Sequence, residues 1–490
     1  MINKEYRNLS RKGLKKRIAA LAMAGVMMLT ACGKSGGSGE GGASQGTAIG
    51  QGVTTTLPGT GENPGQGDEP GAGQGGNIST EVKKEGNGIG APQGVTTNLS
   101  ASITRGEVTN STESEEEAFI NATANLSFAL MKYLTQNGDG SNVMISPESV
   151  ITALAMTENG AKGETLNEML EVLGGGMTLD QYQKAVAGFN GKLTSTEPAC
   201  LSMANSIWLR NSEEMKISES FLQTNVDYHN SEFFLADFDN NTLNDVNSWV
   251  NEKTNGMIQK TLDQLSPDTM MLLINAAAFE AKWMDEYEET QVHEGRTFTN
   301  AKGEEETVTM LNSTEYGLIE LNGGQGFVKK YEGGQYAYVA ILPGEGVSAD
   351  EYLAGLKGED FIKAYQNRSF EKNIIVNMPE FKSDYDISLI DAFNSLGMTT
   401  ALSDAAQFGG MLESGEDILK IGDIIHKTHI EVDRNGTKAA AVTVVEMEKC
   451  SAEMEPASPV FITLDRPFVY AIVETDTGLP VFLGTVNTVK

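Results

Sequence analysis

Residues 436–451 read GTKAAAVTVVEMEKCS, and this stretch says more about the fold than any other part of the chain. In an extended strand, successive side chains point to opposite faces. One face would carry only uncharged side chains: Thr437, Ala439, Ala441, Thr443, Val445 and Met447. The opposite face would carry three charges, among Lys438, Ala440, Val442, Val444, Glu446 and Glu448. This division predicts a strand whose uncharged face packs against the core of a sheet.

The rest of the chain predicts helices first and strands later. Apolar residues recur at helical spacing between residues 119 and 134, and residues 150–156 and 166–173 form two shorter helical patterns. Apolar or alternating runs predict strands at residues 201–209, 270–279, 336–342, 374–378 and 460–473. Without a regular strand–helix–strand rhythm, this order predicts one large α+β domain with helices packed on mainly antiparallel sheets.

Five sequence blocks occur in a fixed order around these elements. They are residues 142–150 (NVMISPESV) with 159–165 (NGAKGET), 246–250 (VNSWV) with 254–258 (TNGMI), 273–275 (LIN) with 282–283 (KW), 425–427 (IHK), and 465–468 (DRPF) with 482–484 (FLG). Together they extend over about residues 115–490 and resemble the signatures of the serpin family. The resemblance implies the serpin fold with an exposed reactive-centre loop, and inhibition of a serine protease that cuts this loop and is trapped covalently.

The resemblance also assigns roles to individual residues. The hinge that inserts into the main sheet would consist of Gly436, Thr437, Ala439, Ala440, Ala441 and Thr443. A polar cluster under the centre of the sheet, where the strands part, would consist of Ser146, Ser149, Asn275 and His426. Trp283 would lie where the inserting strand first enters the sheet. Taken singly, such polar residues are most often structural hydrogen-bonding groups.

Counting about fourteen residues from Gly436, as in the family, places the reactive bond at Cys450–Ser451. A small, weakly polar side chain before the cut suits elastase-like proteases, with subtilisin-like enzymes next. Three neighbouring bonds stay open as alternatives. Cleavage after Lys449 would suit trypsin-like enzymes, and cleavage after Met447 or Met454 would suit subtilisin-like or chymotrypsin-like enzymes.

Two residues depart from the family's pattern. The family usually has an acidic residue two positions before Gly436 and another directly after the hinge threonine, where this chain has Arg434 and Lys438. Lys438 would lie on the solvent face of the inserted strand, where a charge costs little. Arg434 calls the usual ion pair at the top of the sheet into question, but not the insertion itself.

The first 31 residues have the form of an export signal. Seven Lys and Arg residues precede an apolar run at residues 18–28, which is too short for a permanent membrane helix. The run leads into LTAC at residues 29–32, which resembles a bacterial lipobox, so Cys32 is predicted to carry a lipid anchor. An ordinary secretory signal with an incidental cysteine is the alternative. We expect the protein to be exported and anchored on the outer face of a bacterial membrane, at the cell surface.

Residues 32–112 are rich in Gly, Ser, Thr, Asn and Gln and are predicted to be a flexible tether, which leaves residues 113–490 as the folded domain. A weak repeat within the tether, QGVTTTL at 51–57 and QGVTTNL at 93–99, is interpreted as duplication within a spacer. Residues 33–37 match G-x-S-x-G, but no strand precedes them and no helix follows. They therefore do not predict a catalytic serine.

Charge limits the partners. Of the net charge of −31, residues 1–31 contribute +6 and residues 33–112 contribute −3, which leaves −34 on residues 113–490. Nucleic acid and heparin-type activators require a basic face, so neither is expected as a partner. The protein is expected to be a monomer.

The cysteines and histidines point to no cofactor. With Cys32 lipidated, Cys200 and Cys450 are the one pair left for a disulfide or a redox role. His426 and His429 would face opposite sides of a strand, so no metal site is predicted.

Three alternative functions fit the sequence less well. A serpin fold without inhibition, serving as a surface binding module, comes second, and the small hinge residues argue against it. A solute-binding lipoprotein fits the signal and the tether but leaves the hinge pattern unexplained. An enzyme fits least, because no nucleophile–base motif lies in a usable context.

Overall fold

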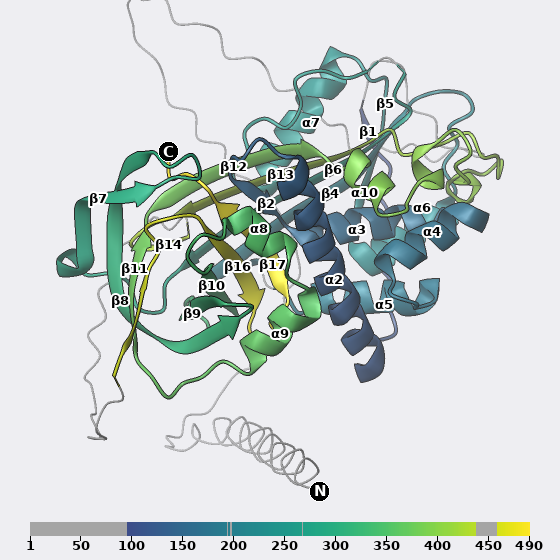
Figure 1. Ribbon diagram of the computed structural model, residues 1–490. Coiled ribbons are helices and arrows are strands. Elements are labelled where there is room, and N and C mark those ends of the chain that lie inside the picture. The colour runs from purple at the N-terminus through teal and green to yellow at the C-terminus, as the bar shows by residue number, and fades with distance from the viewer. Residues whose placement is uncertain (1–95, 194, 197, 267, 438–457) are drawn as a thin grey trace, which may run out of the picture. The chain divides into compact units, whose positions relative to one another are not determined.

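The computed structural model describes residues 96–193, 195–196, 198–266, 268–437 and 458–490 (Figure 1). These residues form two β-sheets with helices packed on them, which confirms the predicted α+β class.

The main sheet has eight strands. Its order is β1 (Thr97–Asn98), β5 (Glu232–Ala236), β4 (Ala199–Arg210), β6 (Met271–Lys282), β14 (Gly436–Thr437), β13 (Asp423–Val432) and β12 (Phe381–Ser388), and β3 (Ser195–Thr196) pairs with β4. The strands predicted at residues 201–209 and 270–279 are β4 and β6, which pair antiparallel with each other.

Two central strands of this sheet, β6 and β13, run parallel and pair directly from Leu272 opposite Asp423 to Ala278 opposite His429. At one end the short β14 lies between them and is antiparallel to both. Thr437 of β14 is opposite Ala281 of β6 and Val432 of β13. The two central strands are therefore already parted at this end and closed along the rest of their length.

The second sheet has nine strands. Its order is β15 (Val460–Thr463), β11 (Ile374–Pro379), β8 (Glu305–Leu321), β9 (Gly324–Lys330), β10 (Tyr336–Leu342), β16 (Phe468–Glu474), β17 (Pro480–Val486) and β2 (Val143–Ile145), and β7 (Val292–Thr299) pairs with β8. The strands predicted at residues 336–342 and 374–378 are β10 and β11.

The run at residues 460–473, which the sequence predicts as one strand, is two strands. β15 pairs in parallel with β11, whereas β16 lies between β10 and β17. The break contains Pro467, which has no N–H for a ladder hydrogen bond. It also contains Arg466, which donates to the carbonyl oxygen of Pro343 at 2.6 Å. Both flanking segments are apolar, so their composition does not distinguish two strands from one.

The α-helices of the described residues are α2 (Glu113–Asn137), α3 (Pro147–Glu158), α4 (Gly163–Leu173), α5 (Leu179–Asn190), α6 (Glu219–His229), α7 (Asn240–Lys253), α8 (Ala349–Ala354), α9 (Gly358–Gln366) and α10 (Ile390–Ser395). The three predicted helical patterns lie in α2, α3 and α4 and are confirmed. Short 3₁₀ turns occur at Glu289–Gln291, Thr400–Leu402 and Gly409–Met411. Within the described ranges, no helix is long and apolar enough to cross a membrane.

Helices α3 and α7 cover opposite faces of the main sheet (Figure 1). Val246 and Val250 of α7 pack in one apolar cluster with Ile274 of β6 and Ile425 of β13. The next residue of β6, Asn275, points to the other face and bonds to α3. Any strand that enters between β6 and β13 therefore meets α3 on one side and α7 on the other.

Residues 96–112 pack on the folded domain, so the predicted domain start at residue 113 lies too late. Thr97 and Asn98 pair with Leu235 and Phe234 of β5, and Leu99 is buried in the core. Further along, the N–H of Gly106 donates to the Asp227 side chain at 2.6 Å. These contacts are made with residues far away in sequence, and the polar composition of the segment gives no sign of them.

Candidate functional site

Strand β14 is the part of the predicted hinge that the structure describes. A Cβ atom on Gly436 would lie 2.1 Å from the carbonyl oxygen of Ala281, so only glycine fits this close approach to β6. Thr437 is fully buried, and its hydroxyl shares a hydrogen bond of 2.6 Å with the Tyr331 hydroxyl. Thr437, which the sequence predicts to be buried on insertion, is thus already in the sheet.

Trp283 lies directly beside β14. Its ring stacks on Tyr331 with centroids 4.6 Å apart, and its indole N–H donates to the carbonyl oxygen of Asp433 at 2.8 Å. Its backbone N–H donates to the carbonyl oxygen of Asn435 at 2.9 Å. The structure therefore places Trp283 at the point where the chain leaves β13 and turns into β14.

Asp433 shapes that turn, and sequence reasoning missed it. Its Oδ1 accepts from the N–H groups of Asn435 and Gly436 at 2.7 and 3.0 Å. An aspartate that bonds to the backbone two residues on is a common turn former. The sequence DRNG at residues 433–436 carries this signal and could have revealed the turn.

Arg434 forms ion pairs with two acidic residues at this end of the sheet. Its Nε lies 3.5 Å from Oε1 of Glu380, and its Nη1 lies 3.4 Å from Oε2 of Glu289. Its backbone N–H also donates to Glu380 at 3.2 Å. The arginine at position 434 therefore has acidic partners of its own at this end of the sheet.

We expect Arg434→Glu to lower the midpoint of thermal unfolding, because it would place a third carboxylate beside Glu289 and Glu380. Adding Glu380→Arg should recover most of the loss by restoring an opposite-charge pair. The side chains are partly exposed, so the coupling free energy should be about 0.5–1 kcal/mol. Thermal unfolding of the wild type, both single variants and the double variant measures it. A double variant no more stable than Arg434→Glu alone would contradict this assignment.

The four residues predicted as a polar cluster meet beneath the main sheet. His426 and Asn275 are opposite each other on β13 and β6, and Nδ1 of His426 bonds to Oδ1 of Asn275. The N–H of Ser146 donates to Nε2 of His426 at 3.0 Å, so the His426 proton is on Nδ1. Asn275 Nδ2 donates to Ser149 Oγ at 2.7 Å. One direct bond of this cluster therefore crosses from β6 to β13.

The cluster includes a fifth residue that sequence reasoning missed. Asn205 of β4 accepts through Oδ1 from Asn275 at 2.7 Å and from Ser149 at 3.2 Å. In the sequence, the feature that could have indicated Asn205 is its position as a polar residue within the run at residues 201–209. Burial lowers the pKa of His426 to about 3, so the imidazole is neutral at physiological pH. The cluster is a neutral hydrogen-bonded network, which can be rearranged without moving a charge.

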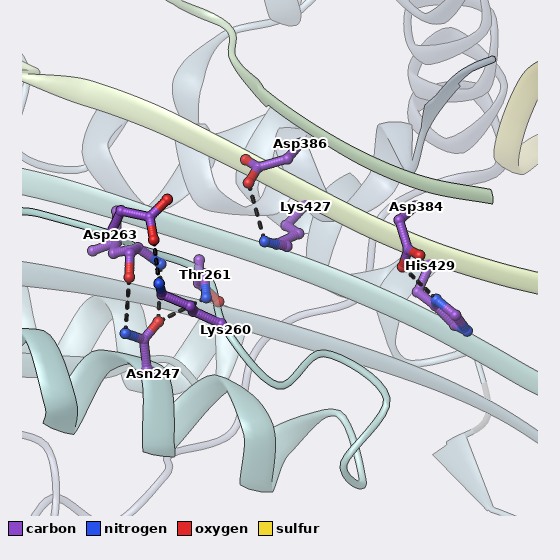
Figure 2. Close-up of polar contacts among 9 residues, drawn as sticks. Asn247, Lys260, Thr261, Asp263, Asp384, Asp386, Lys427 and His429 are labelled. Atoms are coloured by element: carbon purple, nitrogen blue, oxygen red, sulfur yellow. Dashed lines mark hydrogen bonds and ion pairs between the residues drawn. The ribbon is translucent and has the colours of Figure 1, made fainter. Parts of the chain in front are cut away.

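The outer face of β13 carries a different set of contacts. Figure 2 shows Lys427 and His429 directed at Asp386 and Asp384 of β12. Lys427 Nζ lies 3.0 Å from Oδ2 of Asp386, and His429 Nδ1 lies 2.6 Å from Oδ1 of Asp384. His426 and His429 thus face opposite sides of the sheet, as predicted. Within the described ranges, no three His, Cys, Asp or Glu side chains are grouped as metal ligands.

The chain that follows α7 also lies on this outer face. Asn247 of α7 accepts from the N–H of Thr261 at 2.7 Å and donates to the carbonyl oxygen of Leu262 at 3.0 Å (Figure 2). Lys260 and Asp263 form an ion pair in the same segment. Leu262 belongs to the apolar cluster that covers Ile274 and Ile425. Parting of β6 and β13 would therefore disturb the packing under this segment.

Several predicted site residues lie outside the described residues. They are the hinge residues Ala439, Ala440, Ala441 and Thr443, the reactive-bond candidates Cys450, Ser451, Lys449, Met447 and Met454, and the lipidation candidate Cys32. Cys200 is half-buried on β4, and its candidate disulfide partner Cys450 is outside the described ranges.

Comparison with known proteins places this arrangement in a family. A sequence profile described as "Serpin (serine protease inhibitor)" matches residues 121–489. The crystal structure of a thermophilic serpin, tengpin, in its native state is similar, with 39% identity, a TM-score of 0.73, and coverage of 80% of this chain and 99% of that chain. An uncharacterised serpin-like protein of Thermococcus kodakarensis is 30% identical, over 77% of this chain and 87% of the relative. The alpha-1-antiproteinase S of Cavia porcellus is 27% identical, over 74% of this chain and 88% of the relative.

Proposed function

Since the chain belongs to the serpin family, we propose that it inhibits a serine protease by trapping it as a covalent acyl-enzyme. The protease's serine hydroxyl attacks the carbonyl carbon of Cys450, and Ser451 leaves with a free amino group. The part of the loop N-terminal to the cut, which is joined to the protease through the ester at Cys450, then inserts between β6 and β13 before water hydrolyses the ester. The inserting loop displaces the attached protease and distorts its catalytic site. The protein then acts as a consumed substrate and not as an enzyme.

The position of β14 is the observation that carries this proposal. Its two residues pair antiparallel with both β6 and β13 at the end where these strands are parted. A strand that continued from Thr437 in the same direction would run between them along their whole parallel section. The uncharged face of residues 437–447 would then point to the core side, where Thr437 already points.

Continuation of this register gives each loop residue a fixed pair of neighbours. With Thr437 opposite Ala281 and Val432, Thr443 would come opposite both Asn275 and His426. Adjacent strands are about 4.8 Å apart, so the direct bond between these two side chains would be lost when a strand enters. The Thr443 hydroxyl can accept from His426 Nδ1–H and donate to Asn275 Oδ1. We infer that Thr443 replaces the broken bond.

The same register accounts for Lys438. On the solvent face it would lie between Glu280 of β6 and Glu431 of β13, both half-buried. An acidic residue at position 438, as the family usually has, would place three carboxylates side by side on neighbouring strands. Opposite charges across strands are favourable and like charges are unfavourable. In this chain a lysine at position 438 is therefore more favourable than the acidic residue that the family usually has there.

Incubation with a panel of pancreatic elastase, subtilisin, chymotrypsin and trypsin tests the proposal. We expect a complex with at least one of them that survives boiling in detergent, and a released peptide whose mass identifies the cut. A peptide that begins at Ser451 supports the elastase-like assignment. A start at Cys450 moves it to Lys449 and trypsin-like enzymes, and a start at Glu448 or Glu455 moves it to Met447 or Met454. Clean cleavage without any complex would contradict inhibition and favour a binding module.

We further propose that the inhibitor is exported and held at the bacterial cell surface by a lipid on Cys32. The support is the sequence LTAC at residues 29–32 and the basic and apolar segments before it. Cys32→Ser should release the protein into the medium, because no acyl chain can then be attached. Cell fractionation and mass spectrometry of the mature N-terminus measure this. A wild-type protein that is already in the medium without an acyl group would contradict the proposal.

A further inference from the structure

Helix α3 carries two acidic residues in the protein interior, one near each end. Glu148 is its second residue and Glu158 its last, and both are 0% exposed. Among the described residues, neither oxygen of the Glu148 carboxyl group has a hydrogen-bond partner, and Oε1 of Glu158 has none. Burying an ionised carboxylate in this way costs far more than burying the neutral acid. The geometry therefore favours the protonated form of both groups.

Helix α5 presents polar but uncharged groups to these acids. Gln183 donates through Nε2 to Oε2 of Glu158 at 3.3 Å. The Tyr182 hydroxyl is buried and has no partner within the described ranges. Burial, and then repulsion from Glu158 and Glu148, raises the pKa of this tyrosine well above its ordinary value. The tyrosine is therefore neutral as well.

The histidines around α3 supply no positive charge. On α6, Nε2 of His229 lies 2.6 Å from Oε1 of Gln183, which can only accept, so His229 donates from Nε2. Burial, with a smaller contribution from the exposed Arg105, lowers the pKa of His229 to about 3. His426 of β13, which contacts Ser146, is neutral for the same reason of burial.

The buried side chains of α2, α4, β4, β6 and β17, which also pack on α3, are uncharged, and the acidic residues of α4 (Glu164, Glu168 and Glu171) are not buried. Phe119 of α2 packs on Tyr182, and Thr123 of α2 is buried. Asn205 of β4 and Asn275 of β6 hold Ser149. No ion pair that joins Glu148 or Glu158 to a cation is formed within the described part of the chain. Burial therefore raises the pKa of Glu148 to about 8 and that of Glu158 well above its ordinary value.

We propose that the native fold depends on the protons of Glu148 and Glu158, and that alkaline pH loosens α3 and, through it, the centre of the main sheet. The connection is short, because Ser149 follows Glu148 and bonds to Asn205 and Asn275. The effect on stability stands independently of the inhibitory mechanism. Its effect on sheet opening rests on the proposed function.

The sign of the pH dependence follows from the raised pKa values. The folded protein holds protons that the unfolded chain releases above its ordinary glutamate pKa of 4.5. The stabilising contribution is therefore fully present below about pH 4.5, and for Glu148 it is lost as the pH rises to about 8. Within this window each group changes the ratio of unfolded to folded protein by up to about tenfold per pH unit.

Thermal unfolding of the full chain from about pH 7 to about pH 9 tests this proposal, because below about pH 6.5 the buried His229 and His426 would add a slope of opposite sign. We expect the wild-type midpoint to fall as the pH rises. Glu148→Gln and Glu158→Gln should each reduce the slope, and the double variant should be nearly flat and more stable than wild type at alkaline pH. The matched control is Glu117→Gln, the same chemical change on the exposed surface of α2, which should follow the wild type.

Hydrogen exchange gives a second, local measurement. At one alkaline pH, the backbone amides of α3 should exchange several-fold more slowly in Glu148→Gln than in the wild type, since the chemical exchange rate is common to both. If Glu148→Gln fails to fold, Glu148→Met has a similar volume and serves the same comparison. A double variant whose midpoint falls as steeply as that of the wild type would overturn the proposal. Absence of protease trapping would instead contradict the inhibitory function and leave the unfolding results as they stand.

Discussion

Thr443→Arg is expected to turn the inhibitor into a substrate of its target protease. In the proposed register this side chain meets Asn275 and His426, which are fully buried and uncharged. An arginine there loses its hydration without gaining a carboxylate, which costs several kcal/mol. Insertion slows while acylation at Cys450 is untouched, so hydrolysis overtakes trapping. Titration of protease activity should show the inhibitor consumed per trapped protease rising at least about tenfold.

Lys438→Arg is the matched control for this substitution. It places the same arginine in the same loop, but on the solvent face between Glu280 and Glu431, so the stoichiometry should not change. Thr437→Arg is a less clean test, because Thr437 is already buried beside Tyr331 and its loss would disturb the native sheet as well. If Thr443→Arg traps protease at the wild-type stoichiometry, the register proposed from β14 is wrong.

A single cut at one of the reactive-bond candidates, after Met447, Lys449, Cys450 or Met454, is expected to raise the midpoint of thermal unfolding by tens of degrees, well beyond the few degrees of a typical substitution. The cut frees the loop to pair with β6 on one side and β13 on the other, and buries its uncharged face. Unfolding followed by circular dichroism, before and after cleavage confirmed by mass spectrometry, measures the shift.

In the Thr443→Arg variant, the same cut should raise the midpoint of thermal unfolding less than in the wild type, because the inserted strand would carry a buried charge. This comparison separates insertion from any general effect of cleavage. A wild-type midpoint that stays unchanged after a clean cut would contradict insertion and point to the non-inhibitory alternative.

Side-chain alternation in a strand is a local property with a period of two residues, so the sequence alone can predict which face each hinge residue would present. It does not predict that Thr437 is already in the sheet, since that depends on Ala281 and Val432, which other parts of the chain supply. The same limit applies to Arg434. Its partner Glu289 is 145 residues away, and no local pattern indicates the contact.

Burial of the acids in α3 is also a long-range property. Every residue of this helix is buried, because sheets and other helices surround it on all sides. A helix without an exposed face has no amphipathic pattern to distinguish inward from outward positions. The sequence therefore predicts that α3 is a helix, but not that Glu148 and Glu158 lie inside the protein. The start of the domain at Thr97 and Leu99 was missed for a related reason, since their partners are in β5 and the core.

The pairing of β14 has a kinetic consequence for trapping. Forming the first contact between a free loop and a distant strand requires a conformational search, whose entropy cost comes before any gain. Here Thr437 is already paired on both sides, so the proposed insertion would need no separate nucleation step and would proceed by propagation from an existing end. In the proposed register, each residue from 440 to 446 would separate one of the seven residue pairs that join β6 to β13 and form new pairs in its place. The rate at which β6 and β13 separate should therefore decide whether insertion or ester hydrolysis comes first. Substitutions in the paired residues of β6 and β13 should change the trapping rate more than substitutions in the outer part of the loop.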